Sequence, residues 1–205
     1  MSSSTSVFAC GLVAAALSLA AVTTLAPPAR ADGVFHTRVT PADNEKLAKL
    51  TETRDAALAE ARAGGVKDDL AILDQTLAGD LLSLREGFNP VGDWRCRTLK
   101  LGKGAPLVVY GWFKCRISDD GAGWRLEKLS GSQRTAGFFY DNGDKEMYYL
   151  GVLSVDGDPK ARYGEAPARN QVARAVRPGK NRLRLEFPQP NVESRFDILE
   201  LERGK

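Results

Sequence analysis

The feature that most constrains this chain is a series of short β-rich segments that begins after Asn89-Pro90 and continues to the end of the sequence. Turn sequences such as Asp120-Gly121 and Asp141-Asn142-Gly143 separate the segments, and their glycines supply the backbone angles of tight turns. Eight strands are predicted, over residues 93–101, 107–117, 123–129, 133–140, 145–155, 170–177, 181–187 and 195–202. Strands with short connections favour an antiparallel meander that closes on itself, because closure removes exposed edges. The predicted fold is mainly β, an antiparallel barrel of about eight strands over residues 89–205, with a two-sheet sandwich as the alternative.

Residues 32–88 have the pattern of a short leader followed by an α-helical hairpin. The polar leader spans Asp32–Val39. Thr40-Pro41 then indicates a helix start, with threonine as the N-cap and proline at the first helical position, and Gly64-Gly65 ends this helix. A second helix over about residues 68–79 carries leucines at spacings of three and four. Because the loop between them is short, we expect the helices to form an antiparallel hairpin that buries its apolar stripe on one end or flank of the barrel.

The N-terminus has the pattern of an export signal. An apolar run over Val7–Ala21 is followed by Ala29-Arg30-Ala31, which fits a signal-peptidase site and places cleavage after Ala31. The run of 15 residues is shorter than the roughly 20 needed to span a bilayer, so no stable membrane span is expected after processing. Residues 1–31 are therefore interpreted as a cleaved signal peptide that removes Cys10, and the expected location is the periplasm or the secreted fraction.

Cleavage leaves two cysteines, Cys96 and Cys115, and an even count in an exported chain favours a disulfide between them. If the two face each other across a hairpin that turns around Gly102–Pro106, the numbers of opposed residues sum to 211. The opposed pairs on the cysteine face are then Trp94 with Ile117, Cys96 with Cys115, and Thr98 with Phe113. This face is apolar enough to be the one that points into the core.

The same register gathers basic residues on the opposite face, with Arg95 opposite Arg116 and Arg97 opposite Lys114. Carboxylates of other strands, such as Glu127, Glu193 or Asp197, would neutralise them as an ordinary solvated surface. Alternatively, the arginines form an anion site, because guanidinium groups suit carboxylate and phosphate groups. The candidate anion-binding residues are Arg95, Arg97, Lys114, Arg116 and Arg134.

Composition narrows the classes of function. The net charge of +3 comes from interspersed charges of both signs without a dense basic patch, so nucleic acid is not an expected partner. The sole histidine, His36, leaves no histidine-containing triad or zinc cluster to assemble, and acid pairs such as Asp156 and Asp158 are typical of turns. We therefore predict no catalytic group, no metal and no cofactor. The expected partner is an unidentified envelope component or protein.

Aromatic side chains would line a ligand cavity if the barrel is hollow, because small barrels sometimes hold one molecule, but the interior of an eight-stranded barrel is often filled and most of these aromatics are expected to belong to the core. The candidates for its lining are Trp112, Trp124, Phe138, Phe139, Tyr140, Tyr148 and Tyr149. The function we favour from the residues is an exported, non-enzymatic binding or interaction module of the cell envelope. A small-ligand carrier with a barrel cavity is an alternative.

Several segments together resemble a known family. They are Trp94–Thr98, Tyr110–Arg116, Lys128–Gly137, Arg162–Gly164 and the closing stretch Glu193–Leu201. The chain is similar to the exported bacterial proteins grouped as domain of unknown function 4893, which implies a location but no activity. A looser similarity to small barrel inhibitors of bacterial metalloproteases implies a further alternative, a periplasmic protease inhibitor whose N-terminal segment, here Asp32–Val39, enters the protease cleft.

Overall fold

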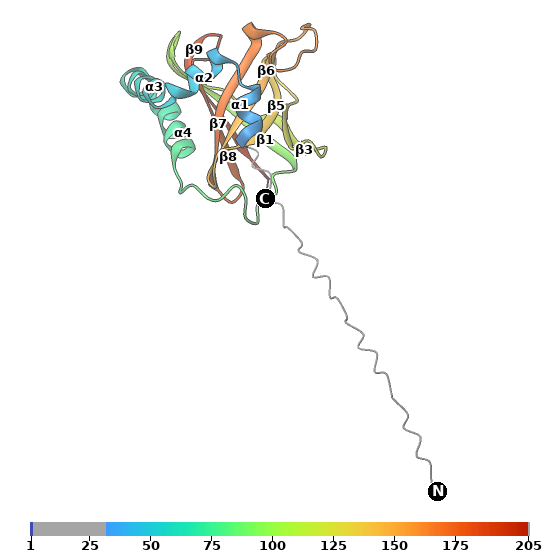
Figure 1. Cartoon of the computed structure of the whole chain (residues 1–205). Coiled ribbons are helices and arrows are strands. Elements are labelled where there is room, and N and C mark those ends of the chain that lie inside the picture. The colour runs from blue at the N-terminus through green and yellow to red at the C-terminus, as the bar shows by residue number, and fades with distance from the viewer. Residues whose placement is uncertain (2–31, 205) are drawn as a thin grey trace.

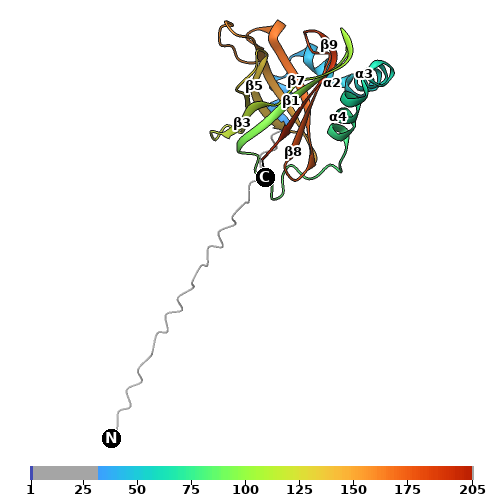
Figure 2. The same ribbon diagram turned by 180° about the vertical axis from the view of Figure 1, so that it is seen from behind.

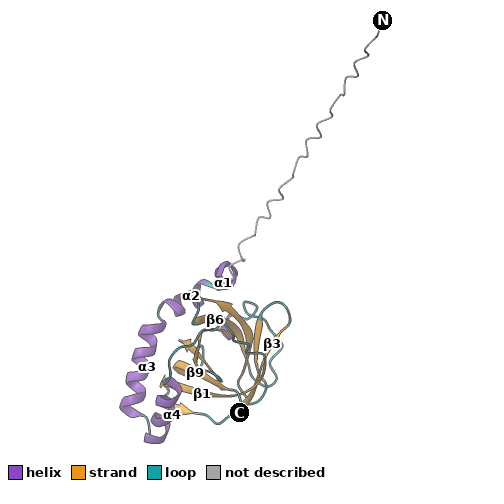
Figure 3. Cartoon of the chain, turned by 90° about the horizontal axis from the view of Figure 1, so that it is seen from below, coloured by secondary structure: helices purple, strands orange, loops and turns teal. Residues whose placement is uncertain are grey.

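The structure, a computed structural model, describes Met1 and residues 32–204. Apart from Met1, the predicted signal peptide and Cys10 lie outside the described residues. Eight antiparallel strands close into a barrel, with a ninth strand added at its edge and helices on the N-terminal side, which confirms the predicted barrel (Figure 1). Seen along its axis, the barrel is a ring of strands with helices α2, α3 and α4 on one side (Figure 3).

The order of the strands in the barrel follows the chain, and β9 closes the ring by pairing with β1. The barrel strands are β1 (Gly92–Lys103), β3 (Phe113–Asp119), β4 (Trp124–Lys128), β5 (Arg134–Asp141), β6 (Glu146–Ser154), β7 (Asn170–Gly179), β8 (Arg182–Pro188) and β9 (Ser194–Glu202). The extra strand is β2 (Ala105–Val109), and a short 3-10 helix, η1 (Pro167–Arg169), precedes β7.

The single strand predicted over residues 107–117 is wrong, because the chain forms two strands there. β2 pairs with the far half of β1, where Leu99 lies opposite Val109. β3 pairs with the near half, where Cys96 lies opposite Phe113. Residues 110–112, which separate β2 from β3, are not part of either strand. This break lets β2 extend beyond the barrel while β3 forms part of the ring.

The predicted register of the cysteine hairpin is also wrong, by two residues. Trp94 lies opposite Cys115 and Arg95 opposite Lys114, so the numbers of opposed residues sum to 209 instead of 211. A shift of two keeps every side chain on its predicted face, because side chains alternate with a period of two. The predicted disulfide is confirmed nevertheless: Cys96 and Cys115 are bonded across a diagonal, with their Cα atoms 5.9 Å apart.

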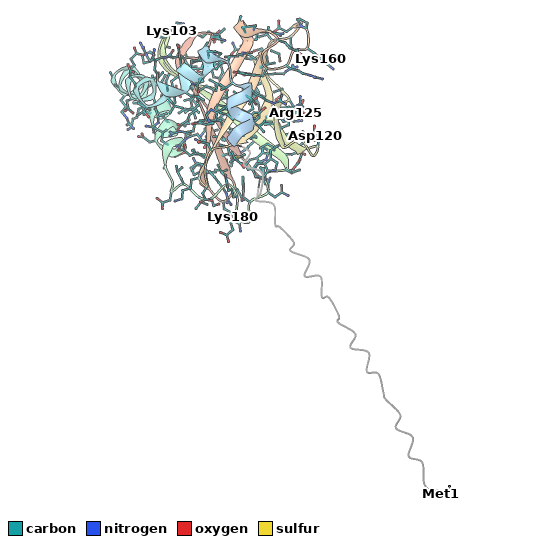
Figure 4. All side chains as sticks on the ribbon, viewed as in Figure 1. Met1, Lys103, Asp120, Arg125, Lys160 and Lys180 are labelled. Atoms are coloured by element: carbon teal, nitrogen blue, oxygen red, sulfur yellow. A yellow bond between two sulfur atoms is a disulfide. The ribbon has the colours of Figure 1, made fainter. Side chains whose placement is uncertain are left out.

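The barrel has two unlike ends. The connections β1–β2, β4–β5, β6–β7 and β8–β9 lie at one end, here called the open end, and the connections β3–β4, β5–β6 and β7–β8 lie at the other, the closed end. Figure 4 labels Lys103 at the open end and Lys180 at the closed end. Residues 78–91 cross the closed end, where the amide of Leu84 donates to the Asp144 carbonyl at 2.8 Å. Leu84 is buried in the apolar core and Phe88 packs against it, so this segment plugs the barrel.

The apolar core fills the closed half of the barrel. Its largest fully buried side chains include Ile117, Leu126, Tyr149, Leu185 and Leu201. The indole of Trp94 donates to the Pro90 carbonyl at 2.8 Å, which satisfies its one polar atom inside the core.

Helices α2 (Pro41–Ala48), α3 (Leu50–Gly64) and α4 (Lys67–Leu77) cover the outer face of the barrel. α2 starts as predicted, because the Thr40 hydroxyl accepts from the Asp43 amide at 3.2 Å. The predicted first helix is divided at Lys49, since α2 packs on β7 while α3 packs on β1, β2 and β9, and the division lets the chain follow the curved wall. α3 and α4 lie against the outside of the barrel (Figure 2). Their apolar stripes pack on Leu99, Leu101 and Ile198 of the outer wall.

The segment interpreted as a polar leader is instead mostly a helix, α1 (Asp32–Arg38). Its Phe35 is buried against Leu150 and Val172 of the outer wall, and its ring stacks on Tyr148 with centroids 4.3 Å apart. The sequence reading missed this contact because Phe35 is one apolar residue in a polar stretch, without a periodic stripe. His36 lies beside it at the surface. None of the described helices is long and apolar enough to cross a membrane.

A buried ionic cluster joins α3 and α4 to the wall. Glu186 of β8 is fully buried and accepts from Arg184 at 2.9 Å and from Arg174 at 2.6 Å, and Arg54 of α3 lies 3.8 Å away. Arg184 also donates to the carbonyls of Thr76 and Leu77, which are left without helical partners at the end of α4. The cluster therefore fastens α4 to the barrel through charged hydrogen bonds, whereas α3 contributes the charge of Arg54 without a hydrogen bond.

Candidate ligand-binding site

The open half of the barrel contains a cavity of about 300 Å³. Its lining comes from the inward positions of strands around the whole ring, together with the rim of the open end. The lining residues are Thr98, Lys100, Tyr110, Phe113, Lys128, Ser132, Gln133, Arg134, Thr135, Leu153, Gln171, Phe187, Glu193, Asp197 and Leu199. The barrel is therefore filled by apolar side chains at the closed end and hollow and polar at the open end.

The floor of the cavity is apolar. Phe187 and Leu199 belong to the core cluster and also line the cavity, and Phe113 packs against the same cluster. The hydroxyl of Tyr149 hydrogen-bonds with Thr135 at 2.7 Å just beneath this surface. A Cβ at Gly151 would lie 2.3 Å from the Tyr149 hydroxyl, so glycine is needed there to make room for the tyrosine that closes the floor.

Lys100 and Glu193 form an ion pair at the rim. The Lys100 ammonium donates to the Glu193 carboxylate at 2.5 Å and to the Gln133 side-chain carbonyl at 3.0 Å. Glu193 adopts φ of 63°, a left-handed conformation that is uncommon for residues other than glycine. The hydrogen bond and charge of Lys100 lower the pKa of the Glu193 carboxyl. The β8–β9 connection is thus held over the cavity by a charged contact.

Asp197 places a buried carboxyl group in the wall. Burial raises its pKa to about 6, against the opposing effects of a hydrogen bond from Ser194 and the charge of Lys100. The Ser194 hydroxyl donates to this carboxylate. Asp197 therefore changes its charge in the range just below neutral pH.

Lys128 places an ammonium group at the cavity on β4. Burial lowers its pKa, and the positive charges of Lys100 and Arg134 lower it further. Its Nζ lies 4.4 Å from the centroid of the Phe113 ring, a cation–π contact. Within the described part of the chain, no carboxylate lies within 4.0 Å of this nitrogen.

Gln171 of β7 has a buried side-chain oxygen, Oε1, to which no described residue donates a hydrogen bond. A buried acceptor without a donor is costly, and such groups are rare in folded proteins. Because Gln171 lines the cavity, a hydrogen-bond donor placed there would satisfy it.

A shallower groove of about 690 Å³ lies between the β6–β7 connection and strands β4 and β5. It shares Lys128, Arg134 and Thr135 with the cavity, and Arg125 and Lys160 line it further out, where Figure 4 labels them. The two hollows therefore meet where the pairing of β4 with β5 ends, beyond Glu127 and Ala136.

The residues predicted to form an anion site divide between two places. Arg95, Arg97, Lys114 and Arg116 lie on the outer face of the barrel, whereas Arg134 lines the cavity. On the outer face, Arg95 pairs with Glu202 at 2.5 Å, Arg97 with Glu200 at 2.7 Å and Arg116 with Asp93 at 2.7 Å. The predicted oppositions of Arg95 with Arg116 and of Arg97 with Lys114 are wrong because of the register shift, which places Arg95 opposite Lys114 and Asp93 opposite Arg116. On the other side of β1, β9 places Glu202 and Glu200 beside Arg95 and Arg97. Whether these outer residues bind an anion stays a prediction.

Of the acids expected to neutralise the outer cluster, Glu127 does lie opposite Arg116, but Glu193 and Asp197 lie at the cavity. Trp112 covers the outer arginines instead, with its ring centroid 4.3 Å from the Arg95 guanidinium carbon and 4.5 Å from that of Arg97. Arg134 donates to the Gly131 carbonyl at 2.9 Å and pairs with Asp156 at 2.8 Å.

Sequence reasoning missed the main cavity residues Lys100, Lys128, Gln171 and Asp197 as a set. A signal was present in β1, where Trp94, Cys96, Thr98 and Lys100 occupy one face and change from apolar to polar toward the open end. The aromatic residues proposed as cavity lining do not line it. Tyr140 and Tyr148 pack on α1 outside the barrel, and Phe139 and Tyr149 belong to the core.

The described residues contain no group of three or more His, Cys, Asp or Glu side chains arranged to hold a metal ion. Fold and cavity together define a small antiparallel barrel that is plugged at one end and has a polar hollow at the other. Residues 35–201 match the family described as Domain of unknown function (DUF4893), and the chain belongs to this family. No curated protein and no solved structure matches it.

Proposed function

We propose that this protein is an exported, non-enzymatic binding module that holds a small organic ligand in the open half of its barrel. The observation that carries the proposal is the cavity of about 300 Å³ with a buried, unpartnered Gln171 oxygen in its wall. Ligand sites are concave, with apolar surface and a few polar groups that fix orientation, and eight-stranded barrels can enclose one small molecule.

The unlike ends of the barrel support binding in one orientation. Leu84 and Phe88 close one end, so a ligand enters from the end that carries Glu193 and Gln133. The apolar floor at Phe187 would contact the part of the ligand that enters first, and the charged groups would contact the part nearer the rim.

Export is part of the proposal. The Cys96–Cys115 disulfide supports it, because disulfides persist in oxidising compartments outside the cytoplasm. The partner in this view is a small molecule of the envelope or its surroundings. We assign the cavity no reaction, and turnover of a bound ligand would contradict this part of the proposal.

The protease-inhibitor alternative has less support. It needs a free segment over Asp32–Val39, whereas Phe35 within that segment is buried on the outer wall. Insertion into a protease cleft would first have to break the contact of Phe35 with Tyr148.

The proposal is tested by filling the cavity. Leu153 lines it, and Leu153→Trp adds a bulky ring in its place. We expect a library of neutral, cationic and anionic fragments to include molecules that shift amide signals of cavity residues in two-dimensional NMR spectra. Those shifts should disappear in Leu153→Trp and persist in the matched control Leu82→Trp, whose leucine is exposed in the plug segment.

Thr98→Phe is a second filling variant, in case Leu153→Trp does not fold, and the dispersion of the NMR spectrum checks the fold of each. The absence of any fragment that binds at the cavity, or binding that both filling variants leave unchanged, contradicts the proposed function.

A further inference from the structure

Three cations gather at the cavity although like charges repel. Lys100 comes from β1, Lys128 from β4 and Arg134 from β5, and all three line the same hollow. Burial disfavours the ammonium form of Lys128 and lowers its pKa, and the charges of Lys100 and Arg134 lower that pKa further. Clusters of this kind are typical of sites that receive a negative charge.

Two of the three cations are already matched by acids. Lys100 is paired with Glu193 and Arg134 with Asp156. Lys128 contacts the face of the Phe113 ring but no carboxylate of the described chain within 4.0 Å. Lys128 is therefore the cation of the three without a direct ion pair; the charge of Asp197 acts on it only from beyond 4.0 Å, which leaves its ammonium group for the charge of a ligand.

Gln171 places a second, independent requirement on the ligand, which is a hydrogen-bond donor. It lies on β7, three strands from β4 around the ring, so the two residues belong to different walls of one cavity. A ligand satisfies the buried Oε1 of Gln171 only if it brings an N–H or O–H group.

Resting on the proposed function, we propose that the ligand is a small organic carboxylate that also carries a hydrogen-bond donor, with its carboxylate at Lys128 and its donor at Gln171. The floor formed by Phe113, Phe187 and Leu199 takes a compact apolar group. N-acylated amino acids and hydroxy acids with a short aliphatic side chain have this chemistry and are small enough for about 300 Å³.

The outer arginines are weaker candidates for the same anion. Arg97 and Arg95 already contact Glu200 and Glu202 and lie under Trp112. Neither of them lines the cavity or the groove described above, whereas Lys128 lines both.

The test uses three matched probes. N-acetyl-L-leucine carries a carboxylate, an N–H donor and an apolar side chain. 4-Methylpentanoate lacks the donor, and N-acetyl-L-leucinamide lacks the charge. We expect calorimetric or NMR titration to show that the first binds roughly tenfold or more tightly than either of the others, because a hydrogen bond to a charged or buried group has about that effect.

Variants assign the contacts to residues. Lys128→Gln should weaken binding of N-acetyl-L-leucine roughly tenfold and leave N-acetyl-L-leucinamide unaffected, whereas Lys180→Gln at the closed end should change neither. Gln171→Leu should abolish the advantage of N-acetyl-L-leucine over 4-methylpentanoate. Arg95→Gln and Arg116→Gln examine the outer face and should leave binding unchanged.

Because Asp197 lies at the cavity, the affinity for a carboxylate ligand is expected to depend on pH. The charged groups that line the cavity around it are Lys100, Lys128, Arg134 and Glu193. A bound carboxylate opposes the ionisation of Asp197, so binding should strengthen roughly threefold or more as the pH falls from 8 to 5.5. Asp197→Asn should bind at pH 8 as tightly as the unmodified protein does at pH 5.5, without this dependence.

The outcomes separate the two proposals. If fragments bind in the cavity but neutral or cationic ones are preferred, or if Lys128→Gln has no effect, the carboxylate proposal is overturned and the proposed function survives. Loss of binding in Arg95→Gln or Arg116→Gln with no loss in Lys128→Gln would move the anion site to the outer face. Tighter binding of a pentapeptide that ends in leucine would identify the ligand as a peptide C-terminus and overturn the assignment to a free small acid.

Discussion

Glu186→Gln is expected to lower the free energy of unfolding by about 3–5 kcal/mol, the range seen when one partner of a buried ion pair is removed. Glu186 is fully buried, and its carboxylate accepts from Arg184 and Arg174. Glutamine keeps the shape but not the charge, so the buried guanidinium group of Arg184 would lose its counter-charge, and Arg174 would keep only Glu146. Urea unfolding followed by circular dichroism measures the change.

The control is Asp74→Asn, which makes the corresponding change from acid to amide in a single ion pair at the surface. Asp74 pairs with Arg62 at 2.9 Å, but both side chains are more than half exposed. Its expected cost is at most about 1 kcal/mol, because solvent screens exposed pairs. Equal costs for the two variants would show that the Glu186 cluster contributes no more than a surface pair.

The double variant Cys96→Ala/Cys115→Ala is expected to lose about 3 kcal/mol of stability. The disulfide closes a loop with a sequence separation of 19, and the chain-entropy relation gives about that value for a loop of this length. Both sulfurs lie in the buried core, so alanine also removes packing atoms there. Chemical denaturation of the oxidised protein and the variant measures the difference.

Reductant provides the control for the disulfide. Dithiothreitol should lower the unfolding midpoint of the unmodified protein toward that of the variant and leave the variant unchanged. A variant as stable as the oxidised protein would mean that strand pairing of β1 with β3 alone holds this part of the barrel.

The barrel was predictable because each strand is bounded by turn residues that act locally. Asp120-Gly121 and Asn142-Gly143 end strands through their own backbone preferences, with φ of 87° at Gly121 and 90° at Gly143. The faces of the strands were predictable for a similar reason, because alternation along one strand needs no knowledge of its partner.

The partners of the strands were not predictable in the same way. A register shifted by two residues gives the same faces, so Trp94 and Cys96 could not distinguish Cys115 from Phe113 as neighbours. The charges of Arg95 and Arg97 are balanced by Glu202 and Glu200, which lie more than 100 positions later in the chain. Such a pairing depends on closure of the ring, which a two-strand argument does not contain.

The cavity was only partly predictable. Alternation in β1 places Thr98 and Lys100 on the inner face, yet whether an inner position is filled or hollow depends on what closes each end. Here Leu84 and Phe88 fill the closed end of the barrel, and both belong to the segment that precedes β1 and not to any strand. Arg134 was found as a basic residue and grouped with the outer arginines, whereas the structure places it at the rim of the cavity, where it pairs with Asp156 of the β6–β7 connection.

Because of the plug at residues 78–91, the two ends of the barrel are expected to differ in how readily they accept amino-acid substitutions. Substitutions at the plugged end disturb the core, since Leu84 contacts it directly. The four connections at the other end surround the hollow and carry few core side chains, so their sequences can be exchanged with little effect on folding. If the barrel binds a ligand as proposed, a family built on it can acquire new ligands by altering the β4–β5, β6–β7 and β8–β9 connections, and the same connections are the positions at which to engineer its specificity.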